Sequence, residues 1–196
     1  MTTILRLAGA ATLFAALAAC SSAPTHFHTL VPRSVSPAGT AAPFVIDVQG
    51  VNVPPQVDQA ALVLRHGASN IAVMDSERWA SPLGDEIRSA LAADLSARLG
   101  THDVHGLPRG KDAAVVRVQV DVRRFDSELG GDATLEAAWS VRGKDQSANC
   151  SSQVVQPAGN SYDSIVDAHQ RALGQLSDRI AIAARAVAAG QSPACQ

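Results

Sequence analysis

The sequence predicts an α+β fold in which two long helices pack on one face of a mainly antiparallel, mixed sheet. Apolar and polar residues alternate over residues 116–123 and again over 133–141, which is typical of two half-buried strands joined as an antiparallel hairpin. Apolar residues also recur every three or four positions over 83–99 and 161–189, which indicates two amphipathic helices. Because no repeat or linker divides the chain, we expect a single domain over residues 27–196.

Shorter strands complete the predicted sheet. The first spans Phe27–Val31, and the second spans Phe44–Val53 with a bulge at Gly50, where the alternation changes phase. The segments Ala60–His66 and Asn70–Met74 predict a further hairpin. Residues 148–155 are expected to add a last strand.

Each predicted helix has recognisable ends. The first is expected to have Ser81 as its N-cap and Pro82 in its first turn, and to stop at Gly100. The second runs from about Ser161 to Ala189 and is rich in alanine in its second half, which allows close packing. The apolar stripes consist of Leu83, Ile87, Leu91, Leu95 and Leu99 in the first helix and of Ile165, His169, Leu173, Leu176, Ile180, Ala183 and Val187 in the second.

The N-terminus predicts a lipoprotein signal. Arg6 precedes an uncharged apolar stretch that ends in Leu17-Ala18-Ala19-Cys20, a sequence that resembles a bacterial lipobox. Cleavage would remove residues 1–19, the Cys20 thiol would carry the lipid, and residues 20–26 would form a short tether. The competing interpretation is a transmembrane helix, but such a helix needs about 20 apolar residues and this stretch is shorter.

The charge of the chain is close to neutral, with a net charge of −2, and loss of Arg6 would take it to −3. A nucleic-acid-binding protein would need a basic face, so nucleic acid is not an expected partner. The chain also lacks a polybasic patch for electrostatic docking at a membrane, so the lipid on Cys20 would have to provide the membrane attachment.

Two cysteines remain once Cys20 is assigned to lipidation. In an oxidising compartment Cys150 and Cys195 most simply form a disulfide, which would tie the C-terminal tail to the middle of the chain. Two free thiols are the alternative.

Motifs for catalysis or metal binding are weak. The sequence has neither a Gly-x-Ser-x-Gly elbow nor a phosphate-binding loop, so we expect no catalytic residue, no metal and no cofactor. His102 and His105 are close in sequence, but they lie in a predicted loop without a Cys partner. His169 is either a buried base or a core histidine bonded to a carbonyl or carboxylate, and we favour the core histidine. The acidic residues around the predicted turn fit turn chemistry better than a cation site; they are Asp126, Glu128 and Asp132.

The two tryptophans carry different expectations. Trp139 falls on the apolar face of a strand and is expected in the core. Trp79 directly precedes the first helix. It either packs beneath the helix start or forms a partner surface with Arg78.

In combination these residues resemble the ABC-type transport auxiliary lipoprotein family, typified by paraquat-inducible protein C. The most distinctive stretch is Glu77-Arg78-Trp79-Ala80-Ser81-Pro82-Leu83, which is similar to the family's Arg-Trp-Ala-x-Pro-Leu. Two departures are Gln59, where the family often has Arg, and His28, where it usually has Tyr. The other matching stretches, in chain order, are Cys20 and residues 27–30, 51–54, 57–58, 63–65, 125–126, 130–131, 135, 139 and 173–181.

The resemblance implies an accessory protein rather than an enzyme. It implies an outer-membrane lipoprotein that faces the periplasm and has a mammalian-cell-entry (MCE) protein and ABC transporter components as partners. Its role would be to dock the MCE protein in a system that moves lipids between the two membranes. Ser21 after Cys20 fits sorting to the outer membrane, and a homo-oligomer would suit such docking.

Two functions of other classes remain open. One is a lipoprotein that itself binds a lipid or small apolar ligand, in a cavity between the helices and the sheet. The other is a periplasmic hydrolase.

Overall fold

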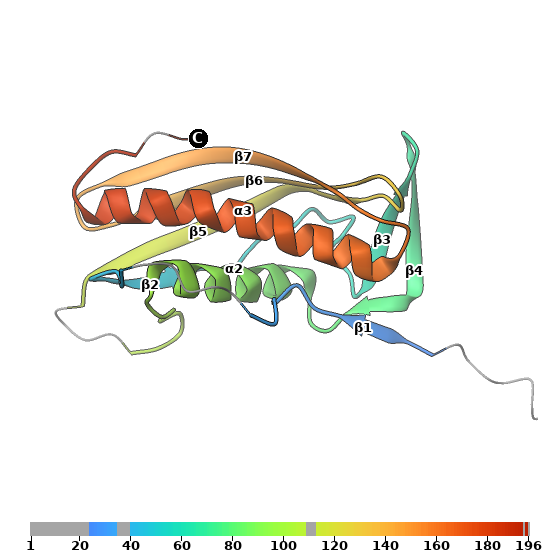
Figure 1. Ribbon diagram of the computed structural model, residues 1–196, viewed down its shortest axis with the longest axis horizontal. Helices are drawn as coiled ribbons and strands as arrows, with labels where there is room; N and C mark the ends of the chain where they lie inside the picture. Colours follow the sequence, from blue (N-terminus) through green and yellow to red (C-terminus); the bar gives the residue numbers. More distant parts are fainter. Residues whose placement is uncertain (1–23, 35–39, 109–112, 194, 196) are drawn as a thin grey trace, which may run out of the picture.

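The computed structural model describes residues 24–34, 40–108, 113–193 and 195. Over these residues it confirms the α+β class, with two helices and two mixed sheets (Figure 1). Along the chain the elements are β1 (His26–His28), β2 (Val45–Val48), β3 (Ala61–His66), β4 (Asn70–Trp79), α2 (Leu83–Leu99), β5 (Val115–Ser127), β6 (Asp132–Arg142), β7 (Ser147–Pro157) and α3 (Tyr162–Ala188).

The larger sheet has the strand order β2-β5-β6-β7. Strands β5, β6 and β7 are antiparallel neighbours, and β2 pairs in parallel with β5. Val120 pairs with Trp139 across the predicted hairpin, so the apolar residues of both strands share one face. This register follows from the sequence, because a slip by one residue would turn every apolar side chain toward solvent.

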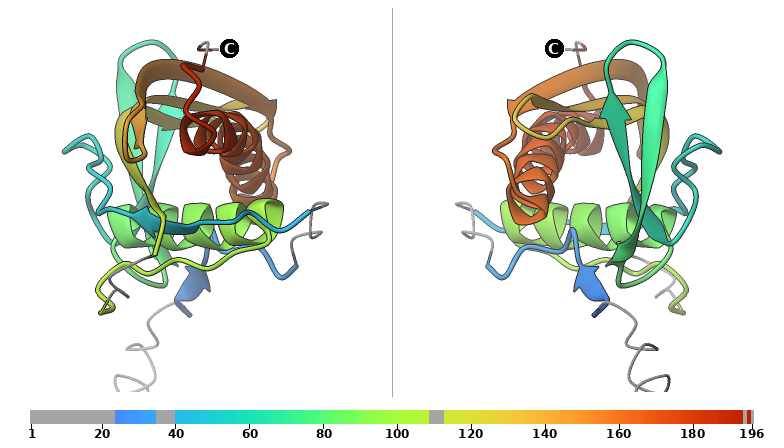
Figure 2. Two further views of the ribbon diagram at one scale, coloured as in Figure 1. Left: turned by 90° about the vertical axis from the view of Figure 1, so that its left-hand side faces the viewer. Right: turned by 90° about the vertical axis from the view of Figure 1, so that its right-hand side faces the viewer.

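Both helices cover the same face of this sheet. Helix α3 packs against β5, β6 and β7, while α2 packs against α3 and the β2 end (Figures 1 and 2). Ser161 caps α3 as predicted, by accepting a hydrogen bond from the amide of Ser164. The predicted cap of α2 was wrong by one residue: Pro82 occupies the N-cap position and makes no side-chain cap bond. The hydroxyl of Ser81 donates instead to Glu86, 2.7 Å away.

The smaller sheet has the order β1-β4-β3 and lies at one end of the larger sheet (Figure 1). Its hairpin is the predicted one, but β4 continues past Met74 to Trp79. A register shift between Ala61 and Leu62 of β3 lets β4 stay paired with β3. The last residues of β4 also pair in parallel with β1. The sequence pattern did not reveal this division into two sheets, because alternation within a strand does not specify its neighbour.

Strand β2 is shorter than the predicted strand over Phe44–Val53, and no bulge continues it past Gly50. Strand β2 ends at Val48, before Gly50, and pairing resumes only as a bridge between Asn52 and Asp121. Between β5 and β6, Gly130 has a φ of 69°, and a Cβ at this position would collide with the side chain of Asn160. The turn itself therefore explains Gly130.

The core fills the space between the helices and the larger sheet, where Leu91, Leu173 and Ile180 are completely buried. None of the helices among the described residues has both the length and the apolar character required to cross a membrane.

Candidate functional site

The N-terminal end of the described chain is joined to the fold by the most distinctive motif of the sequence. Cys20, the predicted signal over 1–19 and the first part of the tether lie outside the described residues, which begin at Pro24. Strand β1 follows at once and pairs with the end of β4, with His26 opposite Glu77, Phe27 opposite Arg78 and His28 opposite Trp79. We call β1, with the residues of 77–86 that hold it, the N-terminal junction.

Glu77 holds both histidines of β1. Its carboxylate accepts hydrogen bonds from His26 Nδ1 (3.0 Å) and His28 Nε2 (2.7 Å), and Glu77 is only 5% exposed. Burial raises the pKa of Glu77, but the hydrogen bonds from His28 and His26, together with the charges of these two residues, outweigh it, so the pKa lies below its ordinary value. On its other side His28 approaches Asp163, at the start of α3, with Nδ1 3.5 Å from the carboxylate. The histidines of β1 therefore link the N-terminal junction to the start of α3.

Glu86 fixes the next residues of the chain. Its buried carboxylate accepts hydrogen bonds from the Thr29 hydroxyl (2.7 Å), the Leu30 amide (2.8 Å) and the Ser81 hydroxyl (2.7 Å). Glu86 belongs to the first turn of α2, where the helix dipole favours a negative charge. Sequence reasoning missed this role, because an acidic residue in a first turn is explained by the dipole alone.

Arg78 and Trp79, the predicted partner surface, point in different directions. Trp79 is 5% exposed and packs edge-on against Phe125, with ring centroids 6.1 Å apart. Its side chain belongs to the core, so Arg78 is the exposed member of the pair. Alternation along β4 places Arg78 on the opposite face, where it is exposed beside Phe27.

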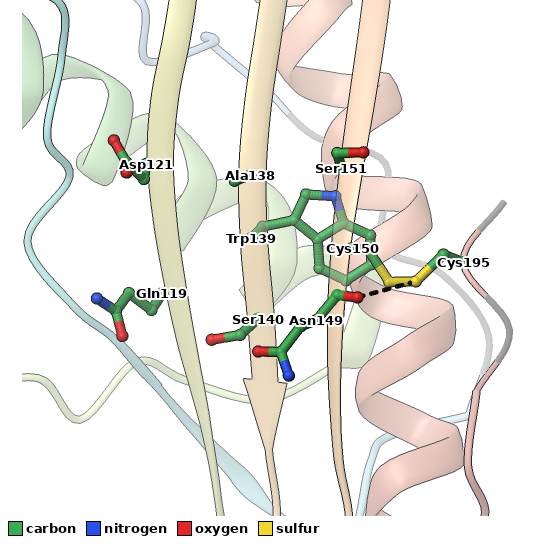
Figure 3. A pocket seen from close by; sticks show the side chains of 9 residues that line it. All are labelled: Gln119, Asp121, Ala138, Trp139, Ser140, Asn149, Cys150, Ser151 and Cys195. Atoms are coloured by element: carbon green, nitrogen blue, oxygen red, sulfur yellow. Dashed lines mark hydrogen bonds between the residues drawn. A yellow bond between two sulfur atoms is a disulfide. The ribbon is translucent and has the colours of Figure 1, made fainter.

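The structure contains the disulfide expected between Cys150 and Cys195, with the two Cα atoms 5.4 Å apart. It lies on β7, an outer strand of the larger sheet, and holds the C-terminal segment there (Figure 3). The Cys195 sulfur is 3.2 Å from the carbonyl oxygen of Asn149; a disulfide sulfur has no proton to donate, so this is a close contact rather than a hydrogen bond.

A hollow of about 680 Å³ lies beside the disulfide (Figure 3). The lining of this hollow is partly polar, and the hollow lies apart from the interface between the helices and the sheet. A lipoprotein that itself binds a lipid or small apolar ligand would need an apolar cavity at that interface. Among the described residues that interface is filled by the core. The residues that line the hollow are Gln119, Asp121, Ala138, Trp139, Ser140, Asn149, Cys150, Ser151 and Cys195.

Ser127 and His169 form a buried pair that the sequence did not indicate. Ser127 Oγ lies 2.8 Å from His169 Nε2, and the imidazole stacks on Phe125 with a centroid distance of 3.8 Å. Burial lowers the pKa of His169 to about 3, against a smaller opposing effect of the Asp126 charge. His169 is thus a neutral core histidine, as expected, but its partner is a hydroxyl rather than a carbonyl or carboxylate. His169 Nδ1 has no hydrogen-bond partner among the described residues, so no acid completes a triad.

Three other candidate side chains have structural partners, and they are those of His105, Asp126 and Trp139. His105 donates from Nδ1 to the buried Asp47, 3.1 Å away, instead of joining His102. Asp126 accepts from Arg65 and Arg124; burial raises its pKa, but these two bonds together lower it below the ordinary value. No group of three metal-ligating side chains occurs among the described residues. Trp139 is in the core as predicted, and its indole donates to Ser152.

Comparison with known proteins agrees with this arrangement. Two solved structures share the fold: a protein described only as uncharacterized, and a DUF330 family protein from Xanthomonas campestris. The first is 21% identical, with a TM-score of 0.65 over 82% of this chain and 98% of the other. The second is 17% identical, with a TM-score of 0.62 over 79% and 92%. A search of curated proteins gave no match. A sequence model described as the ABC-type transport auxiliary lipoprotein component matches residues 28–181, from the junction through most of α3, and the chain therefore belongs to this family.

Proposed function

We propose that this protein is the lipid-anchored subunit that docks a periplasmic MCE protein at the outer membrane, as an accessory of a lipid-transporting ABC system. The family supplies the association with ABC-type transport. The lipobox at Cys20 would supply the lipid anchor. The MCE partner is inferred from the resemblance of the Glu77–Leu83 stretch to the auxiliary lipoprotein family.

The N-terminal junction is the observation that carries the proposal. Two buried carboxylates, Glu77 and Glu86, hold the residues that directly follow the tether. A lipid on Cys20 would then be joined to a fixed point of the folded domain through only a few residues. Such an attachment suits a docking protein, because the position of the anchor limits the position of the whole domain.

We also propose that the protein is not an enzyme. The Ser127–His169 pair has the spacing of a nucleophile and its base, but Ser127 is 4% exposed and His169 is completely buried. A base with a pKa of about 3 would take up very little of the serine proton at neutral pH. The pair is better explained as a polar contact within the core.

Crosslinking in intact cells tests the docking function. We expect the wild-type protein to copurify from the outer-membrane fraction with an MCE protein, identified by mass spectrometry. The matched variant is Cys20→Ala, which keeps every residue of the folded domain but cannot be acylated at this position. It should appear in the soluble periplasmic fraction with its disulfide formed.

Two results would contradict the proposal. One is recovery of no MCE protein from membranes in which a known transport assembly is captured in parallel. The other is fractionation of Cys20→Ala with the outer membrane to the same extent as the wild type, which would exclude Cys20 as the anchor.

A further inference from the structure

The face of β1 opposite its two histidines is apolar and exposed. Phe27 is 67% exposed, although an aromatic side chain in a folded domain is usually largely covered. Its cross-strand neighbour Arg78 is also exposed and forms no ion pair with the described residues. The pair places an aromatic ring and a free guanidinium side by side at the point where the chain enters the fold.

The length of the tether limits how far this pair can lie from the membrane. Phe27 is seven residues after Cys20, so a fully extended chain separates them by at most about 25 Å. A lipid on Cys20 keeps that residue at the bilayer surface. The first exposed apolar side chain of the described domain is therefore held close to lipid headgroups.

A second exposed apolar residue lies on the same side of the molecule. Leu107 is 58% exposed in the segment between α2 and β5. The described part of this segment, residues 100–108, and β1 lie on the lower side in every view, whereas β7 lies on the upper side (Figures 1 and 2). Leu107 and Phe27 thus belong to widely separated elements that share one side of the fold.

We propose that this lower side, the proximal face, rests on the phospholipid surface, with the side chains of Phe27 and Leu107 entering the boundary between headgroups and acyl chains. Arg78 would lie among the phosphates, to which a guanidinium donates paired hydrogen bonds. Aromatic and leucine side chains bind membranes at this depth when a lipid anchor supplies the second attachment. The inference rests on the proposed anchoring at Cys20. It goes further by giving the domain one orientation, with β7 and the C-terminal segment turned away from the bilayer.

Tryptophan substitution in the full-length, acylated protein tests this orientation. Phe27→Trp, Leu107→Trp and the control Val155→Trp each place an indole at an exposed apolar position, and Val155 lies on β7, on the opposite side. The proteins are reconstituted into vesicles of phosphatidylcholine and phosphatidylglycerol with brominated acyl chains. Signal from the buried Trp79 and Trp139 is subtracted with the wild-type protein.

We expect a blue shift and a loss of fluorescence for Phe27→Trp and Leu107→Trp, and neither for Val155→Trp. Adding Arg78→Glu to Phe27→Trp should reduce the quenching. Protein that floats with the vesicles but shows no more quenching at position 27 or 107 than at 155 overturns the proximal face and leaves the anchor intact. A blue shift without bromine quenching means that protein covers the face, which also overturns the inference. Protein that fails to float overturns the anchoring and the inference together.

Discussion

Replacing His169 by glutamine should remove much of the acid sensitivity of the fold. Burial lowers the pKa of His169 to about 3, whereas the unfolded chain takes up this proton near pH 6.5. The unfolded state therefore binds more protons than the folded state between these two values. By linkage, the contribution of this group to the free energy of unfolding falls as the pH is lowered from about 6.5 to about 3, and it is constant above pH 6.5.

The magnitude follows from the interval between the two pKa values. At pH 5 the unfolded imidazole is protonated and the folded one is not, so the loss relative to pH 7.5 is about 2 kcal/mol, at about 1.4 kcal/mol for each pH unit below 6.5. The assay is urea unfolding, at pH 7.5 and pH 5, of a chain that begins at Pro24. The wild type should lose about 2 kcal/mol more between these pH values than His169→Gln does.

Two further variants make the test specific. His66→Gln changes an exposed histidine of the β3–β4 hairpin and should keep the full wild-type pH dependence. The pair Ser127→Ala with His169→Leu removes both polar partners, so neither is left unsatisfied, and it should behave as His169→Gln does. A wild-type pH dependence that persists in both His169 variants would refute the reasoning.

Three other predictions concern the junction, the disulfide and the core. Glu77→Ala should lower the free energy of unfolding by about 2 kcal/mol and speed amide exchange in β1, because His28 loses its buried acceptor. The pKa of Glu77 in the folded state lies below 4.5, so the difference in free energy of unfolding between the wild type and Glu77→Ala should be largest above pH 4.5 and should shrink as the pH falls through the folded pKa. A difference that grew in acid would contradict this prediction. Cys195→Ala should lower stability by about 4 kcal/mol in the polymer estimate, because the disulfide closes a separation of 45 residues, and a thermal midpoint equal to that of the wild type would count against it. Trp79→Ala should cost about 3–5 kcal/mol in urea unfolding, whereas Arg78→Ala should cost almost nothing, and equal effects would place Trp79 outside the core.

The periodic parts of the fold were predictable from the sequence. The β5–β6 hairpin has a strict alternation, and α2 and α3 have apolar stripes at helical spacing, so each element could be located without knowledge of its neighbours. Helix ends were less certain. Ser161 caps α3 as expected, but Ser81 lies one residue before the N-cap of α2 and donates a hydrogen bond to Glu86. A serine hydroxyl can donate to a nearby carboxylate instead of accepting from a helix amide, and the sequence does not show which it will do.

The candidate site was predictable only as a list of residues. The sequence singled out the Glu77–Leu83 stretch, but it left open whether Trp79 packs beneath the helix start or forms a partner surface. It did not indicate that Glu77 and Glu86 bind the N-terminal residues. The decisive contacts join residues far apart in the chain: 49 positions separate His28 from Glu77, and 57 separate Thr29 from Glu86. Local sequence patterns do not indicate which distant residues will be hydrogen-bond partners.

The α+β class, the two helices, the central hairpin and the likeness to auxiliary lipoproteins could all be read from the sequence, which also favoured a disulfide between Cys150 and Cys195 over two free thiols. These depend on periodicity, on the number of cysteines and on short motifs, all of which can be read along the chain. Three further features became visible only in the folded chain: β1 completes a second sheet, Glu77 and Glu86 bind the N-terminal segment, and Ser127 contacts His169 inside the core. The physical reason is that burial, and the hydrogen bonds that buried polar groups require, depend on which distant segments pack together.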